Sequence, residues 1–347
     1  MDLRMAGVRN RTALVAHGGA GSASPGAERA ERRRAMMAAM RIGAGILRAS
    51  GSALEAVVGT VAALEDHPLF NAGYGSVLNS EGNVEMDASV MFAEPVADPT
   101  ARKPASRGKR PGHSEHSIGF DYSVSAGAVA AVSRVRNPIV LARAVMEHSP
   151  HILMAGAGAE SFARKAGIRL VRPEEMVTER ARERWRARKQ HSGMLEAESA
   201  ARAAMGHGTV GAVAVDVHGG IAAATSTGGV PGKLFGRVGD SALIGAGTFA
   251  HAFGAASATG QGEAIILTAL GREAVLALAD GSPQTVAREA ILEMIDATGA
   301  EAGVILVDRR GRIGYAHNAV SMQVARYDRA GGLCHLWLKP IAMGRRP

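Results

Sequence analysis

The chain contains very little cysteine and no long apolar run. Its 347 residues include a single cysteine, Cys334, so an internal disulfide cannot form and nothing points to an oxidising compartment. The N-terminal stretch is too polar for a signal peptide, and no segment approaches the roughly 20 apolar residues that a membrane span requires. We therefore expect a cytoplasmic, soluble protein without a membrane partner.

Aromatic residues make up only 4% of the chain, although the net charge is +8 and the pI is about 10.1. A nucleic-acid site needs its basic residues clustered with stacking aromatics or a reading motif. Here the basic residues gather in segments typical of loops, so we expect no nucleic-acid partner. The alternative is a basic binding protein that uses residues 101–110, and it predicts salt-dependent binding that is lost when this stretch is deleted.

Hydrophobic residues make up 47% of the sequence, enough for the core of one large domain or two smaller ones. Groups of predicted strands are separated by groups of predicted helices, which suits two packed sheets flanked by helix layers. A doubly wound sheet would need regular strand and helix alternation, which this chain lacks. The pattern predicts an α+β fold, an αββα sandwich.

Several helices and strands are predicted by periodicity and by cap signals. Helical spacing over 27–63 is interrupted at 50–52, where Ser52 and Glu55 have the spacing of a capping box. Ser282 and Pro283 mark the N-cap and first residue of a helix ending at Thr298. Further helices are expected over 137–166, broken at 149–150, and over 263–280. Strands are expected over 11–15, before a glycine-rich loop, over 84–92 paired with 123–132, and over 302–308 and 313–316 as a closing hairpin.

Two stretches are poor in apolar anchors. Residues 93–122 are rich in proline, glycine, serine and basic side chains, which favours a mobile surface insertion. Residues 172–208 alternate acidic and basic side chains, as a solvated helix or a disordered linker does. This charged linker ends directly before Thr209, where a poorly anchored tail could move away after a cut.

The segment from Gly206 to Gly229 predicts a hairpin with hydroxyl groups at one end. A buried-strand pattern over 210–215 is followed by a turn and by a second apolar strand over 221–224. Because antiparallel partners place the start of one strand beside the end of the other, Thr209 should lie near the cluster 225–227. Gly206 to Gly211 also matches GxGxxG, but these glycines open a strand instead of a helix, which argues against a dinucleotide site.

Thr209 could act as a nucleophile if the chain were cut before it. Its α-amine would then titrate near neutrality, with an unperturbed pKa of about 7.7 to 8.0, and could accept the hydroxyl proton. Gly208 can adopt the backbone angles that internal attack on its carbonyl needs. The alternative is that Thr209 is an ordinary structural residue at the start of a buried strand.

The order and spacing of several motifs resemble the plant-type asparaginase and isoaspartyl peptidase family of N-terminal nucleophile hydrolases. The motifs, in chain order, are HGGAG, LEDHPLFNAGYGSVLN, MDASVM, GTVGAVAVD, AAATSTGG, KLFGRVGDSALIGAG and SATGQGE. The similarity extends over about residues 12–328. It implies cleavage between Gly208 and Thr209, giving an α subunit of residues 1–208 and a β subunit of residues 209–347 that together form one domain. It also implies the four-layer αββα sandwich and assembly as an (αβ)2 heterotetramer.

The resemblance also implies roles for individual residues. Thr209 is the nucleophile that attacks L-asparagine or a β-aspartyl dipeptide and releases L-aspartate. Thr227 and Asn71 orient it, and Thr259 and Gly260 stabilise the oxyanion. Arg237 binds the substrate α-carboxylate and Asp240 its α-amine, next to Thr259, Gly260 and Gly262. No organic cofactor is expected, and a structural sodium ion is implied at the main-chain carbonyls of Leu64, Glu65, His67, Phe70, Ala72 and Tyr74.

Each of these residues also has a simpler interpretation. Asn71 could form only an Asx turn, Arg237 and Asp240 only a local salt bridge, and Thr259 and Gly260 only a glycine-rich helix start. The chain departs from the family at the insertion 93–122, at Gln261, and at Ala302, where a glycine is usual. A glycosylasparaginase-like hydrolase and an inactive, uncleaved relative are the remaining alternatives.

Overall fold

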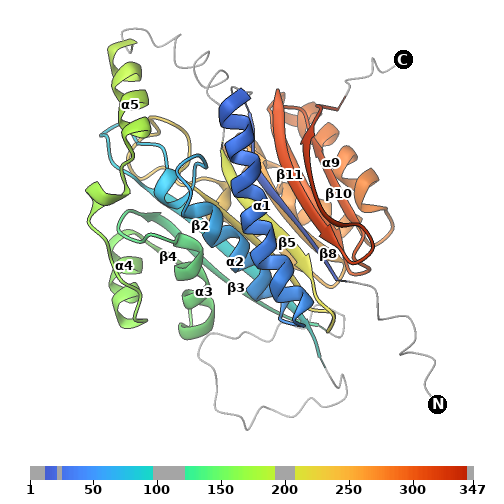
Figure 1. Ribbon diagram of the computed structural model, residues 1–347. Helices are drawn as coiled ribbons and strands as arrows, with labels where there is room; N and C mark the ends of the chain where they lie inside the picture. The colour runs from blue at the N-terminus through green and yellow to red at the C-terminus, as the bar shows by residue number, and fades with distance from the viewer. Residues whose placement is uncertain (1–11, 22–25, 97–121, 192–207, 342–347) are drawn as a thin grey trace, which may run out of the picture.

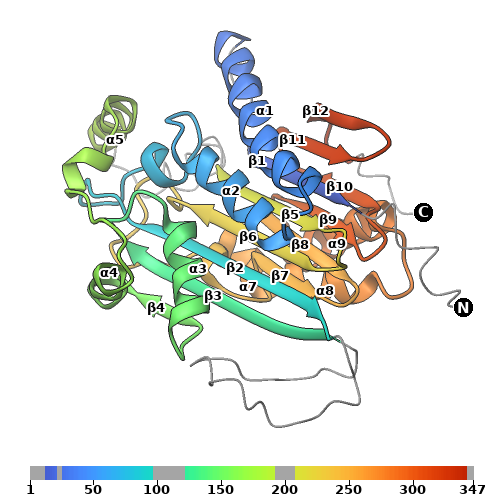
Figure 2. The same ribbon diagram turned by 60° about the horizontal axis from the view of Figure 1, so that its bottom comes forward.

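Two β-sheets form the centre of the protein, and helices flank them (Figure 1, Figure 2). The computed structural model describes residues 12–21, 26–96, 122–191 and 208–341. Over these residues the larger sheet has eight strands in the order β12-β11-β1-β5-β6-β2-β3-β4, and the smaller has four in the order β10-β9-β8-β7. The large sheet comprises β1 Ala13–Gly21, β2 Met86–Pro95, β3 Tyr122–Val132, β4 Leu153–Ala155, β5 Thr209–Val215, β6 Ile221–Thr227, β11 Ser321–Asp328 and β12 Gly332–Leu338. The small sheet comprises β7 Thr248–His251, β8 Gly254–Gly260, β9 Ala302–Asp308 and β10 Ile313–His317.

The two sheets pack against each other through their central strands, because β5 and β6 contact β8 while β2 contacts β7. Helices α1, α2 and α3 pack on the large sheet, and α8 and α9 pack on the small sheet. The helices are α1 Gly26–Arg48, α2 Ala53–Glu65, α3 Pro138–His148, α4 Gly156–Lys165, α5 Glu179–His191, α7 Gly262–Leu267, α8 Leu270–Ala277 and α9 Pro283–Thr298. Three short 3-10 helices are η1 Gly73–Gly75, η2 Pro173–Met176 and η3 Asp240–Ala242. Within the described ranges, no helix is both long and apolar enough to cross a bilayer.

The central strands are buried on both faces, which explains their continuous apolar runs. On β5, Val210, Ala212 and Ala214 belong to the core beneath the helices of the large sheet. Val213 and Val215 belong to the second core, between the sheets. Because side chains alternate across a strand, one short sequence supplies both cores.

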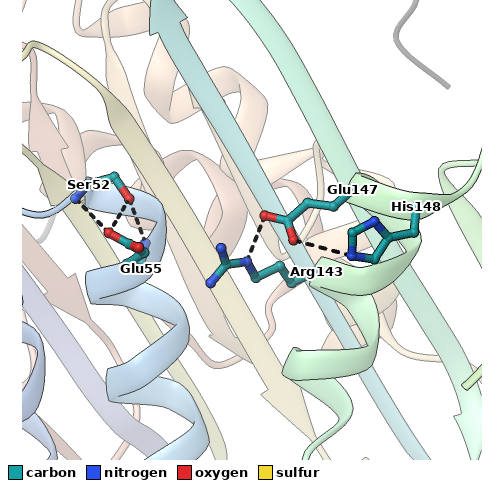
Figure 3. Close-up of polar contacts among 5 residues, drawn as sticks. All are labelled: Ser52, Glu55, Arg143, Glu147 and His148. Carbon is teal, nitrogen blue, oxygen red and sulfur yellow. Dashed lines mark hydrogen bonds and ion pairs between the residues drawn. The ribbon is translucent and has the colours of Figure 1, made fainter. Parts of the chain in front are cut away.

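The predicted helix caps are confirmed. Ser52 and Glu55 form a reciprocal capping box at the start of α2, as Figure 3 shows. Figure 3 also shows Glu147 on α3 accepting from Arg143 at 2.8 Å. The side chain of Ser282 accepts from the amide of Thr285 at the start of α9. Local side-chain signals therefore set where these helices begin.

The predicted strand pairs are also confirmed, with one difference at the glycine-rich motif. β2 pairs with β3, and β5 pairs with β6 so that Thr209 lies opposite Thr227. The motif HGGAG, expected as a loop after the first strand, instead continues β1 to Gly21. A register shift between His17 and Ala20, with φ of +97° at Gly19, lets the strand bulge without ending.

Several other features were missed or differ, among them the hairpin of β7 and β8, which was not expected. The hairpin of β9 and β10 does not close the fold, because β11 returns to pair with β1 and β12 continues the large sheet. The helix expected over 263–280 is divided into α7 and α8 at Ala269, which has φ of +47°. The short strand β4 was not expected, and its three residues pair with β3. The pairing of β11 with β1 joins segments at opposite ends of the chain, so it leaves little local signal.

Most of the described part of the charged segment before Thr209 is helical, in η2 and α5. Of the two alternatives, α5 is a helix that contacts the body through the pair Arg180–Glu28 at 2.8 Å and through Trp185 beside Gly82. The remainder of this linker, residues 192–207, and residues 97–121 of the predicted insertion lie outside the described residues.

Candidate functional site

The hydroxyl groups of Thr209 and Thr227 meet at one end of the β5–β6 hairpin. Thr209 Oγ1 donates to Thr227 Oγ1 at 3.3 Å, and Thr227 Oγ1 lies 3.4 Å from the carbonyl oxygen of Gly208 as a donor to it. Both threonines are buried. In the uncut chain two hydrogen bonds therefore follow in series, from the Thr209 hydroxyl to Thr227 and from Thr227 to the carbonyl oxygen of Gly208.

Asn71 holds the turn that follows Thr227. Its Nδ2 donates to the carbonyl of Gly229 at 2.7 Å, and its Oδ1 accepts from the amide of Val77 at 2.9 Å. The amide of Gly229 in turn donates to Thr227 Oγ1 at 3.0 Å. Asn71 also lies against Gly208, where an added Cβ would come within 2.9 Å of the Asn71 Cβ. The side chain therefore does more than form a local turn, since it supports both Thr227 and the Gly208 junction.

His17, from the HGGAG motif, contacts the same centre from β1. Its Nε2 lies 2.9 Å from Ser257 Oγ, its Nδ1 lies 3.4 Å from the amide of Gly19, and its ring also bonds the backbone of Thr209. Complete burial lowers the pKa of His17 to about 3. His17 is therefore a neutral hydrogen-bonding group at physiological pH, not a titrating base.

A chain of buried hydroxyls extends from His17 between the two sheets. Ser257 Oγ lies 2.7 Å from Thr225 Oγ1, and Thr248 Oγ1 donates to Thr225 Oγ1 at 2.7 Å. Ser89 continues the chain at 2.8 Å from Thr248 and also donates to the carbonyl of Ser241. Sequence reasoning missed this network, because its members come from five strands and each looks like an ordinary small polar residue.

Thr259 and Gly260 end strand β8 next to the glycine-rich bulge. Thr259 is fully buried, and its Oγ1 accepts from the amide of Ala20 at 3.3 Å, which leaves its own proton available for donation. Gly260 has φ of +142°, and a Cβ there would collide with the carbonyl of Glu301. Only glycine fits at position 260. The two residues end a strand, and they are not simply the start of a helix.

Arg237 and Asp240 lie next to Gly262 but do not pair with each other. Arg237 donates through Nε and Nη2 to Glu263 Oε1, at 3.0 and 2.8 Å. A Cβ on Gly262 would lie 2.8 Å from both Arg237 Nη2 and Asp240 Oδ1. The simpler expectation of a local salt bridge between Arg237 and Asp240 is therefore wrong. Glu263 was missed by the sequence analysis, although it directly follows the glycine motif.

Asp240 carries an unpaired buried oxygen. Burial raises its pKa to about 7, an effect that the positive charge of Arg237 partly opposes. Its Oδ2 has no hydrogen-bond partner within the described part of the chain. A buried carboxylate with an open oxygen is chemically suited to receive a cation such as an ammonium group.

The loop that follows α2 turns its carbonyl groups inward. A Cβ on Gly75 would collide with the carbonyl of Phe70 and lie within about 3 Å of those of Pro68 and His67, and one on Gly73 would lie 2.5 Å from the carbonyl of Glu65. These carbonyls crowd Gly73 and Gly75, so that a side chain would not fit at either position. Burial also raises the pKa of the Glu65 carboxyl group to about 8. Among the described residues, no group of three or more His, Cys, Asp or Glu side chains could hold a metal ion.

Comparison with known proteins identifies the family to which the chain belongs. The family model described as asparaginase matches residues 10–97 and 121–333, and the chain belongs to this family. The mouse protein named isoaspartyl peptidase/L-asparaginase is 41% identical over 301 residues, which cover 86% of this chain and 82% of the mouse protein.

Two further relatives support the same family membership. The human isoaspartyl peptidase/L-asparaginase is 40% identical, with 86% of this chain and 87% of the human protein covered. The isoaspartyl peptidase of Escherichia coli K12 is 37% identical over 322 residues, with 90% of this chain and 91% of that protein covered. The resemblance noted from the motifs is therefore confirmed over most of the chain.

Proposed function

We propose that this chain is an autoprocessing threonine amidohydrolase that releases L-aspartate from L-asparagine and from β-aspartyl dipeptides. The observation that carries the proposal is the placement of the Thr209 hydroxyl, which donates to Thr227 next to the Gly208 carbonyl. Membership of the asparaginase family and the names of the relatives support the substrate class.

Maturation begins with attack of Thr209 Oγ1 on the carbonyl carbon of Gly208. Thr227, which donates to that carbonyl oxygen, stabilises the negative charge that develops there. The proton lost from the Thr209 hydroxyl is transferred to the Thr209 nitrogen as the peptide C–N bond breaks, which leaves an ester. Water hydrolyses the ester to a Gly208 carboxylate and a free Thr209 α-amine. The products are an α subunit of residues 1–208 and a β subunit of residues 209–347.

The mature enzyme uses the same hydroxyl on an external amide. The α-amine of Thr209 accepts the hydroxyl proton while Oγ1 attacks the side-chain carbonyl of the aspartyl group. The Thr259 hydroxyl and the Gly260 amide stabilise the oxyanion, and the leaving amine departs with a proton. Water then hydrolyses the acyl-enzyme, which releases aspartate and restores the Thr209 hydroxyl.

Substrate recognition is assigned to the opposite charges beside Gly262. Arg237 has a planar set of donors that suits the α-carboxylate, and the open Oδ2 of Asp240 suits the α-ammonium group. Both substrates share this aspartyl head group, so one pair of side chains serves both. The small-molecule substrate is thus held by its head group while the leaving group varies.

The remaining parts of the proposal concern assembly and environment. The packed sheets and flanking helices support the four-layer αββα sandwich of N-terminal nucleophile hydrolases, with two αβ units assembling as (αβ)2. The carbonyls of Leu64, Glu65, His67, Phe70, Ala72 and Tyr74 would hold a structural sodium ion, which would rigidify the loop carrying Asn71. A cytoplasmic location is part of the same proposal.

Intact-mass analysis of the purified protein, with N-terminal sequencing of any fragment, tests the proposal directly. We expect two chains, the smaller beginning Thr-Val-Gly-Ala, and a single chain for Thr209→Ala. Hydrolysis of asparagine, a β-aspartyl dipeptide and a glycosylated asparagine is then compared. A wild-type chain that stays uncut and inactive, or a Thr209→Ala variant that keeps full activity, contradicts the proposal, and activity confined to the glycosylated substrate favours the glycosylasparaginase alternative.

A further inference from the structure

A buried cluster of charged side chains lies beneath the loop that carries Arg237 and Asp240. Glu85, Asp87 and Lys233 are each no more than 5% exposed. Glu85 precedes β2, Asp87 lies on β2, and Lys233 comes from the loop itself. Two buried acids so close together are unusual, since buried charge is costly unless it is paired or hydrogen-bonded.

Both carboxylates accept hydrogen bonds from the backbone of the loop. Glu85 Oε1 and Oε2 lie 3.0 and 3.2 Å from the amide of Gly236, and Asp87 Oδ2 accepts from the amide of Gly239 at 2.9 Å. These two amides lie on either side of Arg237, and Gly239 directly precedes Asp240. The acids therefore fix the short stretch of backbone from which both side chains project.

The second oxygen of each carboxylate is bonded to the body of the protein. Glu85 Oε2 accepts from Asn79 Nδ2 at 2.8 Å, and Asp87 Oδ1 accepts from the amide of Ala131 at 2.9 Å. Asp87 thus connects the loop to strand β3, and Glu85 connects it to the turn that carries Asn79. Only a carboxylate can do this, because an amide side chain would turn an NH2 group toward one of the donors.

Lys233 supplies the compensating charge and connects the cluster to the hydroxyl centre. Its Nζ donates to the carbonyl of Glu85 at 2.9 Å. Burial lowers the pKa of Lys233, while the charges of Asp87 and Glu85 oppose that shift. Its side chain also lies against Gly229, where an added Cβ would come within 2.9 Å of Nζ. Gly229 is the residue whose amide donates to Thr227.

We propose that Glu85 and Asp87, whose negative charge Lys233 balances in part, are positioning residues that hold Arg237 and Asp240 in the geometry that binds the aspartyl head group. They touch neither the substrate nor the reacting atoms. They set the affinity for the head group by fixing the backbone amides on either side of Arg237. The inference rests on the proposed roles of Arg237 and Asp240.

The test uses the mature wild-type enzyme and the variants Glu85→Gln and Asp87→Asn, with Glu94→Gln as the matched control. Glu94 is the exposed acid on the same strand, so its variant makes the same change of charge without touching the loop. We expect KM for asparagine to rise about tenfold in each cluster variant while kcat stays within about threefold. The inhibition constant for L-aspartate should rise by the same factor, and the control should match the wild type in all three constants.

Other outcomes overturn the inference. An unchanged KM in correctly folded cluster variants excludes a positioning role, and a fall in kcat at constant KM assigns the cluster to the chemistry instead. If Asp87→Asn fails to fold, judged by thermal melting, Glu85→Gln alone decides, because its amide contact reaches the other side of Arg237. A wild-type chain that neither matures nor hydrolyses asparagine contradicts the proposed function itself, which separates the two failures.

Discussion

The two halves of the candidate site are built from different chemistry. The centre around Thr209 consists of neutral groups, namely hydroxyls, backbone amides and a histidine whose pKa is lowered to about 3. The loop around Arg237 consists of charges, with Asp240 directly in the site and Glu85, Lys233 and Asp87 beneath it. In the proposed mechanism a proton moves in the first region, and the new α-amine of Thr209 carries out that step because the neighbouring groups are neutral. In the proposed function the second region recognises a zwitterion, which calls for charges of both signs.

Removal of one hydroxyl from the neutral centre has the largest expected effect. Thr227→Val keeps the branched shape but loses the donor to the Gly208 carbonyl and the acceptor for Gly229. We expect self-cleavage, and hydrolysis by any mature enzyme, to slow about 10²- to 10³-fold, as for loss of one oxyanion donor. Gel time courses and initial rates measure both, and Thr227→Ser should retain most of the rate. Equal rates in the valine variant and the wild type would show that the hydroxyl path is not used.

Neutralising a charge in the loop should act on binding instead. Asp240→Asn removes the partner proposed for the substrate ammonium group, so kcat/KM for asparagine should fall about 10²-fold, within the range for truncating one buried charged partner. Self-cleavage should proceed at the wild-type rate, because the Gly208–Thr209 bond carries no such ammonium group. If Asp240→Asn blocks self-cleavage as strongly as Thr227→Val does, the two regions do not have the separate roles proposed for them.

Crowding the contact between the neutral centre and the small sheet should lower stability. A Cβ on Gly211 would collide with Ser257 Oγ and lie 2.5 Å from His17 Nε2. We expect Gly211→Ala to destabilise the protein by about 1–3 kcal/mol, the usual cost of overpacking. Gly45→Ala is the control, since it lies in the interior of α1 with no atom within 4 Å of the added Cβ. That change should stabilise by up to about 1 kcal/mol in the same denaturant titration. Similar free energies of unfolding for the two variants would contradict the close approach at Gly211.

The two regions should also differ in pH dependence. Asp240 has its pKa raised to about 7 by burial, so below that pH it loses the charge that binds ammonium. Affinity for L-aspartate should therefore fall as pH drops from 8 to 6, and Asp240→Asn should remove this dependence. His17 adds no titration in this range, because its pKa is about 3.

The raised pKa of Asp240 also affects stability, and here the effect of pH is opposite to its effect on affinity. A carboxyl group whose pKa is raised in the folded state stabilises the fold below its ordinary pKa of 3.8, and this contribution is lost as pH rises to about 7. Asp240→Asn should therefore gain melting temperature relative to the wild type at pH 8 but not at pH 4. A parallel pH profile for the two proteins in thermal melting would contradict the raised pKa.

Local patterns accounted for much of the fold. The capping box at Ser52, the N-cap at Ser282 and the turn between β5 and β6 are set by neighbours in sequence, so their boundaries could be predicted. The bulge in β1 could not, because it depends on β11, which lies some 300 residues away in the chain. Register between distant strands is decided by packing on both faces and leaves no periodic signal.

The candidate site divides in the same way. The sequence by itself determined the family and the hairpin, because motif order and strand alternation are properties of the chain, and the family resemblance proposed Thr209, Thr227, Arg237 and Asp240 as site residues. Only the tertiary structure decided that Arg237 pairs with Glu263, that His17 is buried as a neutral group, and that Glu85 and Asp87 hold the loop. These depend on burial and on contacts between remote segments, which set hydrogen-bond partners and pKa values and which no local pattern encodes.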